Sequence, residues 1–90
     1  MLFVVDRDLP GVSLDQLQQA RRRTVETSAR FTAAGRPVVY VRSLWVPGDS
    51  RTVFVFEAAS ADLVEEVNRA ARFPFLRLAE AVELPDEARW

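Results

Sequence analysis

The chain has 90 residues and a mass of 10.2 kDa, which is the length of a single domain. Its net charge is −1 and its pI about 5.4, so no nucleic-acid partner is expected. The absence of Cys, His and Lys excludes a disulfide, a thiol nucleophile, a Ser-His-Asp triad, an imidazole metal ligand and a Schiff-base lysine. Neither a signal peptide nor a membrane span is recognisable, which predicts a cytoplasmic protein with no membrane partner.

The first third of the chain predicts a strand followed by a long helix. Residues 2–6 are apolar and rich in β-formers. Ser13 and Gln16 have the spacing of a capping box, in which each side chain bonds a free backbone N–H at the start of a helix. We expect this helix to run to about residue 34, because Gly35 is suited to the left-handed conformation that ends helices.

The remaining elements complete an alternating pattern of strands and helices. We expect a hairpin with strands at 38–46 and 52–58, a helix from Ser60 to about residue 72, and a strand over 75–84. The order β-α-β-β-α-β is typical of the ferredoxin-like α+β fold, with two helices on one face of a four-stranded antiparallel sheet. The prediction is one domain, residues 1–84, with a C-terminal tail, 85–90.

The hairpin is apolar on both faces, which suggests a partner for the sheet. If Val46 pairs with Arg51, one face carries Val39, Val41, Trp45, Phe54 and Phe56, and the other carries Tyr40, Arg42, Leu44, Val53, Val55 and Glu57. The first face is expected to pack on the helices. The second is too apolar for water, and the chain has no further element to cover it. We therefore predict a homodimer that forms a dimeric α+β barrel; the alternative is a half-exposed sheet with scattered apolar side chains.

Polar side chains on that second face form one candidate site. Tyr40 is expected opposite Glu57, with Arg42 on the same face. A few polar groups in an apolar cavity are the usual composition of a small-molecule site. The alternative is that Arg42 and Glu57 form an ion pair buried at the dimer interface.

Three further residues on the helices are candidates. Arg21 is the only charged residue within the apolar arc of the first helix. Its head group either meets a carboxylate, Glu80 first and Glu57 second, or binds the anionic group of a ligand, or reaches out to water. Asn68 and Arg72 border the apolar stripe of the second helix, where they are either solvated helix-edge residues or part of a site.

Several short motifs, in this order, resemble one family of small bacterial proteins of largely unknown function, typified by a nickel-binding protein. They are Arg7-Asp8-Leu9-Pro10-Gly11, Val41-Arg42-Ser43, Phe56-Glu57-Ala58, Val67-Asn68 and Pro74-Phe75. The resemblance covers about residues 2–84 and implies a ferredoxin-like fold, a homodimer and nickel binding. It also implies that many relatives carry His at the positions that match Arg21 and Arg72, and sometimes at the position that matches Asn68. Nickel prefers imidazole or thiolate ligands. Because this chain has neither, we predict no tight nickel binding.

Two functions follow as hypotheses. The first is a small-molecule-binding protein, extending to a cofactor-free cyclase or isomerase. In it Glu57 or Glu80 acts as general base, Arg42 or Arg21 stabilises negative charge, and a small organic ligand contacts Tyr40, Trp45, Asn68 and Arg72.

The second hypothesis is a non-enzymatic protein that binds nickel or another metal. Without His or Cys, its ligands would be oxygens of Asp6, Glu57, Asp62 or Glu80, which suit hard cations. No organic cofactor is expected under either hypothesis.

Overall fold

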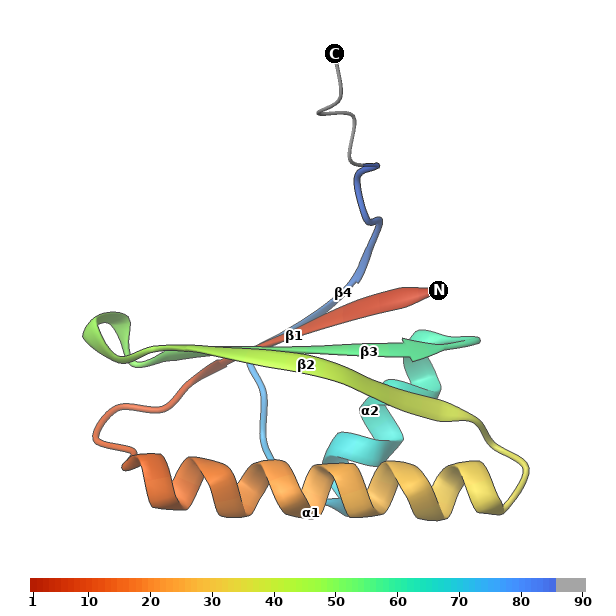
Figure 1. The fold of residues 1–90 in the computed structure, drawn as a ribbon, viewed down its shortest axis with the longest axis horizontal. Coiled ribbons are helices and arrows are strands. Elements are labelled where there is room, and N and C mark those ends of the chain that lie inside the picture. The colour runs from red at the N-terminus through yellow and green to blue at the C-terminus, as the bar shows by residue number, and fades with distance from the viewer. Residues whose placement is uncertain (86–90) are drawn as a thin grey trace.

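The fold has the predicted β-α-β-β-α-β order and a single antiparallel sheet. The computed structural model describes residues 1–85, so of the predicted tail only Pro85 is described. The elements are β1 (Leu2–Asp8), α1 (Leu14–Ala33), β2 (Val38–Val46), β3 (Arg51–Ala58), α2 (Ala61–Ala70) and β4 (Arg77–Ala81). The strand order is β2-β3-β1-β4, and both helices lie on one face of the sheet (Figure 1). The ferredoxin-like prediction is confirmed.

The boundaries of α1 follow from its capping residues. The backbone N–H of Gln16 donates to Ser13 Oγ at 3.1 Å, and the backbone N–H of Ser13 donates to Gln16 Oε1 at 2.9 Å, as the capping box requires. After Ala33 the chain turns through Gly35, whose φ of +84° is the left-handed conformation expected there.

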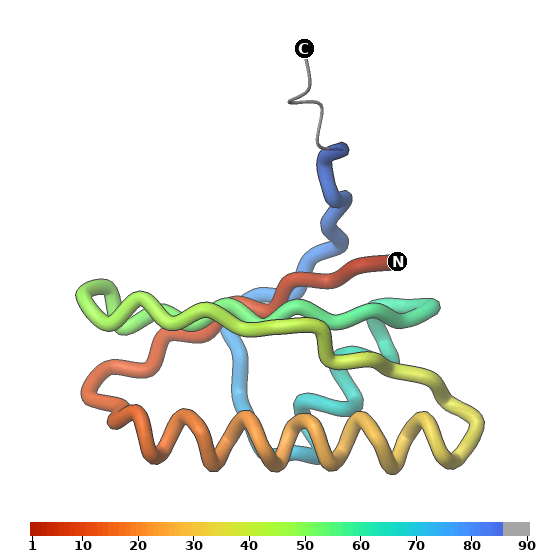
Figure 2. Tube along the Cα trace, in the orientation of Figure 1, coloured from red at the N-terminus to blue at the C-terminus, as the bar shows by residue number. Residues whose placement is uncertain are grey.

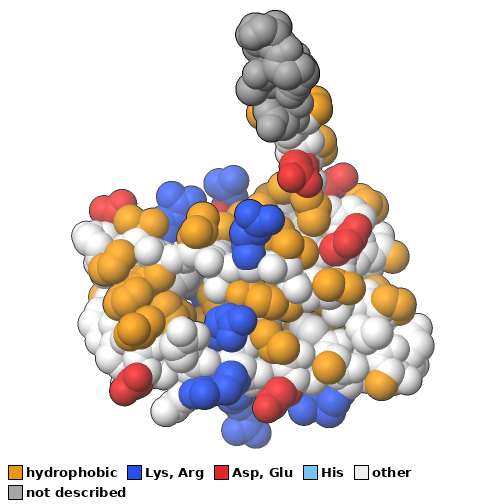
Figure 3. Space-filling view, in the orientation of Figure 1, with side chains coloured by type: hydrophobic (Ala, Val, Ile, Leu, Met, Phe, Trp, Pro, Cys, Tyr) orange, Lys and Arg blue, Asp and Glu red, His pale blue; other side chains and the backbone are white. Residues whose placement is uncertain are grey.

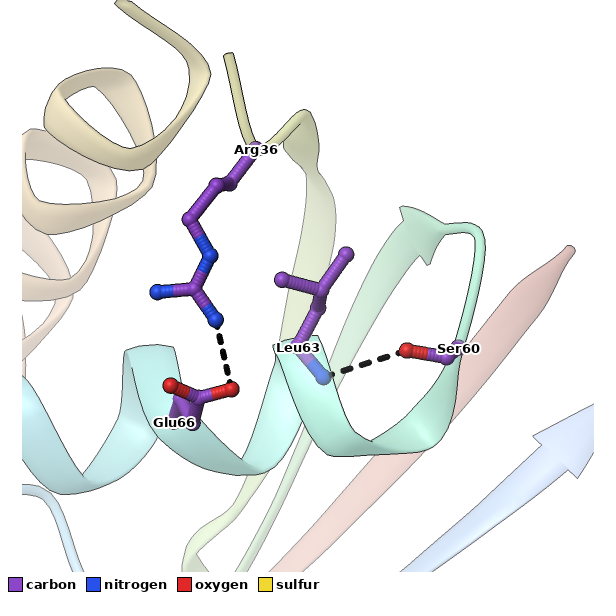
Figure 4. Close-up of polar contacts among 4 residues, drawn as sticks. All are labelled: Arg36, Ser60, Leu63 and Glu66. Carbon is purple, nitrogen blue, oxygen red and sulfur yellow. Dashed lines mark hydrogen bonds and ion pairs between the residues drawn. The ribbon is translucent and has the colours of Figure 1, made fainter. Parts of the chain in front are cut away.

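Helix α2 is also capped as predicted, although it is shorter. The backbone N–H of Leu63 donates to Ser60 Oγ at 3.4 Å, and Arg36 forms a 2.6 Å ion pair with Glu66 that ties the start of β2 to α2 (Figure 4). The helix ends at Ala70 rather than near residue 72, because Arg72 adopts a left-handed conformation with φ 57°.

The lengths of β1 and β4 differ from the prediction. β1 extends to Asp8, because Asp8 pairs with Arg51 at the start of β3. β4 covers only five residues, Arg77–Ala81, and not 75–84. Beyond it the chain leaves the sheet on the side away from the helices (Figure 2). Among residues 1–85, no helix has the length and apolar character needed to cross a membrane.

The core lies between the sheet and the helices. Its larger apolar members are Phe3 and Val5 of β1, Leu17 of α1, Phe54 and Phe56 of β3, Val38, Val64, Val67 and Phe73. Burying an apolar side chain of this size stabilises a fold by roughly 1.5–3 kcal/mol, so this layer dominates stability.

A β-bulge overturns part of the predicted face assignment. The register of β2 and β3 is irregular between Tyr40 and Arg42, so the extra residue, Val41, reverses the alternation of the strand. Tyr40 pairs with Phe56 and packs edge-on against the rings of Phe54 and Phe56, with centroids 5.9 and 6.1 Å away. Val39, not Tyr40, lies opposite Glu57. The expectation that Tyr40 shares a face with Glu57 is therefore wrong.

The outer face of the sheet carries exposed apolar side chains. Leu44 is 64 % exposed there, with Val39 and Val46 also exposed, and Val82 beyond β4 is 80 % exposed. No segment among residues 1–85 covers these side chains. The predicted homodimer, which would cover them, stays a prediction.

Candidate functional site

A cleft opens between α1 and the edge strand β2. It encloses about 560 Å³. Figure 3 shows this side of the molecule, where hydrophobic and arginine side chains intermix at the centre and acidic side chains lie toward the margins. The lining residues are Leu14, Leu17, Gln18 and Arg21 from α1, Tyr40, Val41, Arg42, Ser43, Leu44 and Trp45 from β2, and Phe54 from β3. None of these is acidic.

A short chain of hydrogen bonds crosses the cleft from α1 to β2. Arg21 Nε donates to the hydroxyl oxygen of Tyr40 at 3.1 Å, and the Arg21 guanidinium carbon lies 5.2 Å from the Tyr40 ring centroid. The hydroxyls of Tyr40 and Ser43 are 2.7 Å apart. Arg21 thus meets a phenol and not Glu80 or Glu57, which corrects the predicted carboxylate partner. The bulge makes this contact possible, because it turns Tyr40 toward the helix.

Two further predicted ligand-binding residues join this cleft. Trp45 packs against the core, and its indole Nε1 is buried without a hydrogen-bond partner among the described residues. Arg42 is exposed and contributes to the rim. Four of the six predicted ligand-binding residues, Arg21, Tyr40, Arg42 and Trp45, therefore gather at one place.

The other two predicted ligand-binding residues line a separate cavity of about 550 Å³. Asn68 and Arg72 lie there with Phe73 and Phe75. Asn68 is 0 % exposed, so the prediction that it solvates a helix edge is wrong. Its Nδ2 donates to the carbonyl of Val64 at 2.7 Å. Arg72 is exposed, as a helix-edge residue would be.

Arg7 is the functional candidate that the sequence analysis missed. The side chain is 1 % exposed, and its guanidinium lies between the rings of Phe73 and Phe54, 3.6 and 4.5 Å from their centroids. Its Nη2 donates to Asn68 Oδ1, while Nε and Nη1 have no hydrogen-bond partner within residues 1–85. Burial lowers the pKa of Arg7 to about 9, so the group is still charged at neutral pH. The signal was available: Arg7 continues the alternation of Phe3 and Val5 on the core side of β1.

The predicted catalytic carboxylates lie away from the cleft. Glu57 is exposed at the end of β3, opposite Leu2 and Val39. Glu80 is exposed on β4, opposite Phe3. Neither lines the cleft or the Asn68 cavity. Among residues 1–85 no candidate general base is positioned beside Arg21 or Tyr40.

The acidic side chains also fail to assemble a metal centre. No group of three or more His, Cys, Asp or Glu side chains comes together within residues 1–85. Asp6 instead forms a 2.9 Å ion pair with Arg51. With no imidazole or thiolate in the whole chain, the donor set does not fit nickel.

Comparisons with known proteins agree with the fold. A family model described as "Nickel responsive protein SCO4226-like" matches residues 3–80. The crystal structure of SCO4226 from Streptomyces coelicolor A3(2) superposes with a TM-score of 0.80 at 19 % sequence identity, covering 94 % of this chain and 100 % of that one. No curated protein matches the chain. At this identity the structural likeness establishes the fold alone.

Proposed function

We propose that this chain, which belongs to the SCO4226-like family, binds a small organic molecule in the cleft between α1 and β2. The observation that carries the proposal is the convergence of Arg21, Tyr40, Ser43 and Trp45 on one cleft of about 560 Å³. Small-molecule sites are typically of this size, with apolar walls and a few polar groups that orient the ligand.

The polar side chains of the cleft are held in place by contacts with one another and still have free hydrogen-bond donors for a ligand. Arg21 uses Nε to hold the Tyr40 hydroxyl, and the cation lies against the phenol ring. Its terminal nitrogens make no hydrogen bond within residues 1–85, which leaves donors for a ligand. Trp45 and Phe54 supply aromatic walls. A molecule with an aromatic or aliphatic body and a hydrogen-bond acceptor suits this arrangement.

Binding fits the geometry better than catalysis by a cyclase or isomerase. A general base must lie within hydrogen-bond reach of the proton that it removes. Glu57 and Glu80 lie outside the cleft, and no other carboxylate lines it. We therefore place Glu57 and Glu80 outside the proposed site.

Nickel binding is the second candidate, because the family is described as nickel responsive. The chain has no His and no Cys, and no acidic cluster forms among residues 1–85. We therefore propose that any response of this member runs through the organic ligand of the cleft and not through a bound nickel ion.

We also propose that the working form is a homodimer. The support is the uncovered apolar surface of Val39, Leu44 and Val46 on the outer face, joined by Val82 and Leu84 beyond β4. This surface lies on the side of the sheet opposite the helices and meets the cleft at Leu44, which lines both, so dimerisation would cover one rim of the cleft and leave its helix side free.

Titration with 1-naphthaleneacetamide, a neutral aromatic probe with an amide, tests the proposed cleft. We expect saturable binding with ¹H–¹⁵N shift changes at cleft residues, weakened about 2- to 10-fold in Arg21→Leu and Tyr40→Phe, the range for loss of one hydrogen bond. Arg22→Leu is the matched control, because Arg22 is exposed on the same helix and lies outside the lining. Absence of saturation, or equal effects of the Arg21 and Arg22 variants, would contradict the proposal.

A further inference from the structure

Unpaired polar atoms are concentrated at one place in the core. Among residues 1–85, four buried side-chain nitrogen and oxygen atoms lack a hydrogen-bond partner: Arg7 Nε, Arg7 Nη1, Thr52 Oγ1 and Trp45 Nε1. Buried polar groups are almost always bonded, so each exception requires an explanation. Here the exceptions come from only three residues.

These three residues form one line across the sheet. Arg7 of β1 is the register partner of Thr52 in β3, and Thr52 is in turn the partner of Trp45 in β2. Register partners direct their side chains to the same face, with Cβ atoms roughly 5 Å apart. All three face the helices, and we name Arg7, Thr52 and Trp45 the donor row.

The donor row cannot satisfy itself. The Arg7 guanidinium and the Trp45 indole carry N–H donors and no acceptor. Asn68 takes one donor of Arg7, at Nη2. No acidic side chain forms an ion pair with Arg7 within residues 1–85. The row therefore has an excess of donors and one positive charge, a combination that calls for an anionic acceptor.

The donor row adjoins the cleft. Trp45 and Phe54 both line the cleft, and the Phe54 ring packs against the Arg7 guanidinium. Arg7 and Thr52 do not line the cleft themselves, so a group reaches them from the cleft only if the side chains of Trp45 and Phe54 move apart. Because the guanidinium lies between two phenyl rings, a partner must approach its N–H groups in the plane of the guanidinium, which favours a flat group over a tetrahedral one.

We propose that the ligand of the cleft carries a carboxylate and that the donor row binds it. This inference rests on the proposed function, since it names the chemical class of the same ligand. The carboxylate accepts from Arg7 Nε or Nη1, from the Thr52 hydroxyl and from Trp45 Nε1. Its charge balances that of Arg7, while the body of the ligand remains in the cleft beside Arg21 and Tyr40.

The test compares 1-naphthaleneacetate with 1-naphthaleneacetamide, which have nearly the same shape and differ in charge. Calorimetry on the wild type is expected to give a Kd at least about tenfold lower for the carboxylate, as a charge-assisted bond implies. In Arg7→Met this preference is expected to fall to about one, with the amide Kd changed less than about twofold. Arg22→Met is the control and should keep the wild-type preference.

Two milder variants keep the test decisive where Arg7→Met fails to fold. Thr52→Val keeps the shape of the side chain and removes its hydroxyl, and Trp45→Phe removes the indole N–H. Each is expected to reduce the carboxylate preference several-fold. If both variants keep the wild-type preference for the carboxylate over the amide, the inference is overturned, and water is the remaining partner for the donor row.

The outcomes separate this inference from the proposed function. If the amide binds in the cleft and the carboxylate binds with the same affinity, the donor row does not bind the carboxylate, and only the inference fails. If the carboxylate preference is lost in Arg21→Leu and kept in Arg7→Met, the carboxylate is bound at the rim and the inference also fails. If neither probe binds, the proposed function itself fails.

Discussion

Replacing Asn68 by Leu isolates the interaction that holds a buried charge. Asn68 Oδ1 is the acceptor for Arg7 Nη2, and both side chains are at most 1 % exposed. Leucine has a similar size and supplies no acceptor. The variant would leave the Arg7 guanidinium with no hydrogen bond to any described residue, since Nε and Nη1 have none already.

The expected cost of Asn68→Leu is about 2 kcal/mol, within the roughly 1.5–3 kcal/mol given for a hydrogen bond to a charged group. For a domain of this size 1 kcal/mol lowers Tm by about 4–8 °C, so the melting temperature should fall by about 8–16 °C. Urea denaturation followed by circular dichroism measures the free energy of unfolding, at one fixed protein concentration because association would shift it.

A double-mutant cycle with Arg7→Met shows whether the cost belongs to this contact. In the Arg7→Met background Asn68 Oδ1 has no guanidinium donor to accept from. Asn68→Leu is then expected to leave the free energy of unfolding unchanged or to raise it. The coupling energy should therefore be about 1–3 kcal/mol. Additive effects, within about 0.5 kcal/mol, would refute the argument that Asn68 acts by holding the Arg7 charge.

Three other outcomes are expected. Burial lowers the pKa of Arg7 to about 9 in the folded protein, well below the ordinary value of an arginine, so above pH 9 the folded state holds fewer protons than the unfolded state. The wild type should therefore gain stability relative to Arg7→Met as pH rises through 9; urea titrations at pH 8 and 10.5 measure this, and the opposite slope would contradict it. Sedimentation should give about twice the chain mass of 10.2 kDa, and Val55→Asp, on the outer face, should dissociate or unfold the protein; a wild-type monomer would remove the dimer. Calorimetry with nickel should show no sub-micromolar binding, and one nickel ion per chain at that affinity would reverse the conclusion drawn from the donor set.

The order and type of the elements could be predicted because local interactions determine them. The Ser13–Gln16 capping box, the left-handed Gly35 and the Ser60 cap all act within a few residues of the chain, and each formed as expected. Together with the β-α-β-β-α-β order they specify one packing, with both helices on one face of the sheet. For the same reason Trp45 was correctly placed on the core side of β2.

The candidate site depended on tertiary structure. A single extra residue, Val41, reverses the faces of the first half of β2 and brings Tyr40 to Arg21 in place of Glu57. The alternation of one strand does not show where a bulge will be inserted, because the position of a bulge depends on how two strands pair with each other. Register, not residue type, thus decided which polar groups meet in the cleft.

The buried cation shows the same limit most clearly. From the sequence alone, the alternation of Phe3, Val5 and Arg7 can place Arg7 on the core side of a strand, but it does not show which groups would surround the charge. The partner that makes burial possible, Asn68, is 61 residues away, and the two rings that cover the guanidinium come from β3 and from the segment after α2. Only the folded chain brings these groups together, because the free energy of a buried charge depends on neighbours from every element around it.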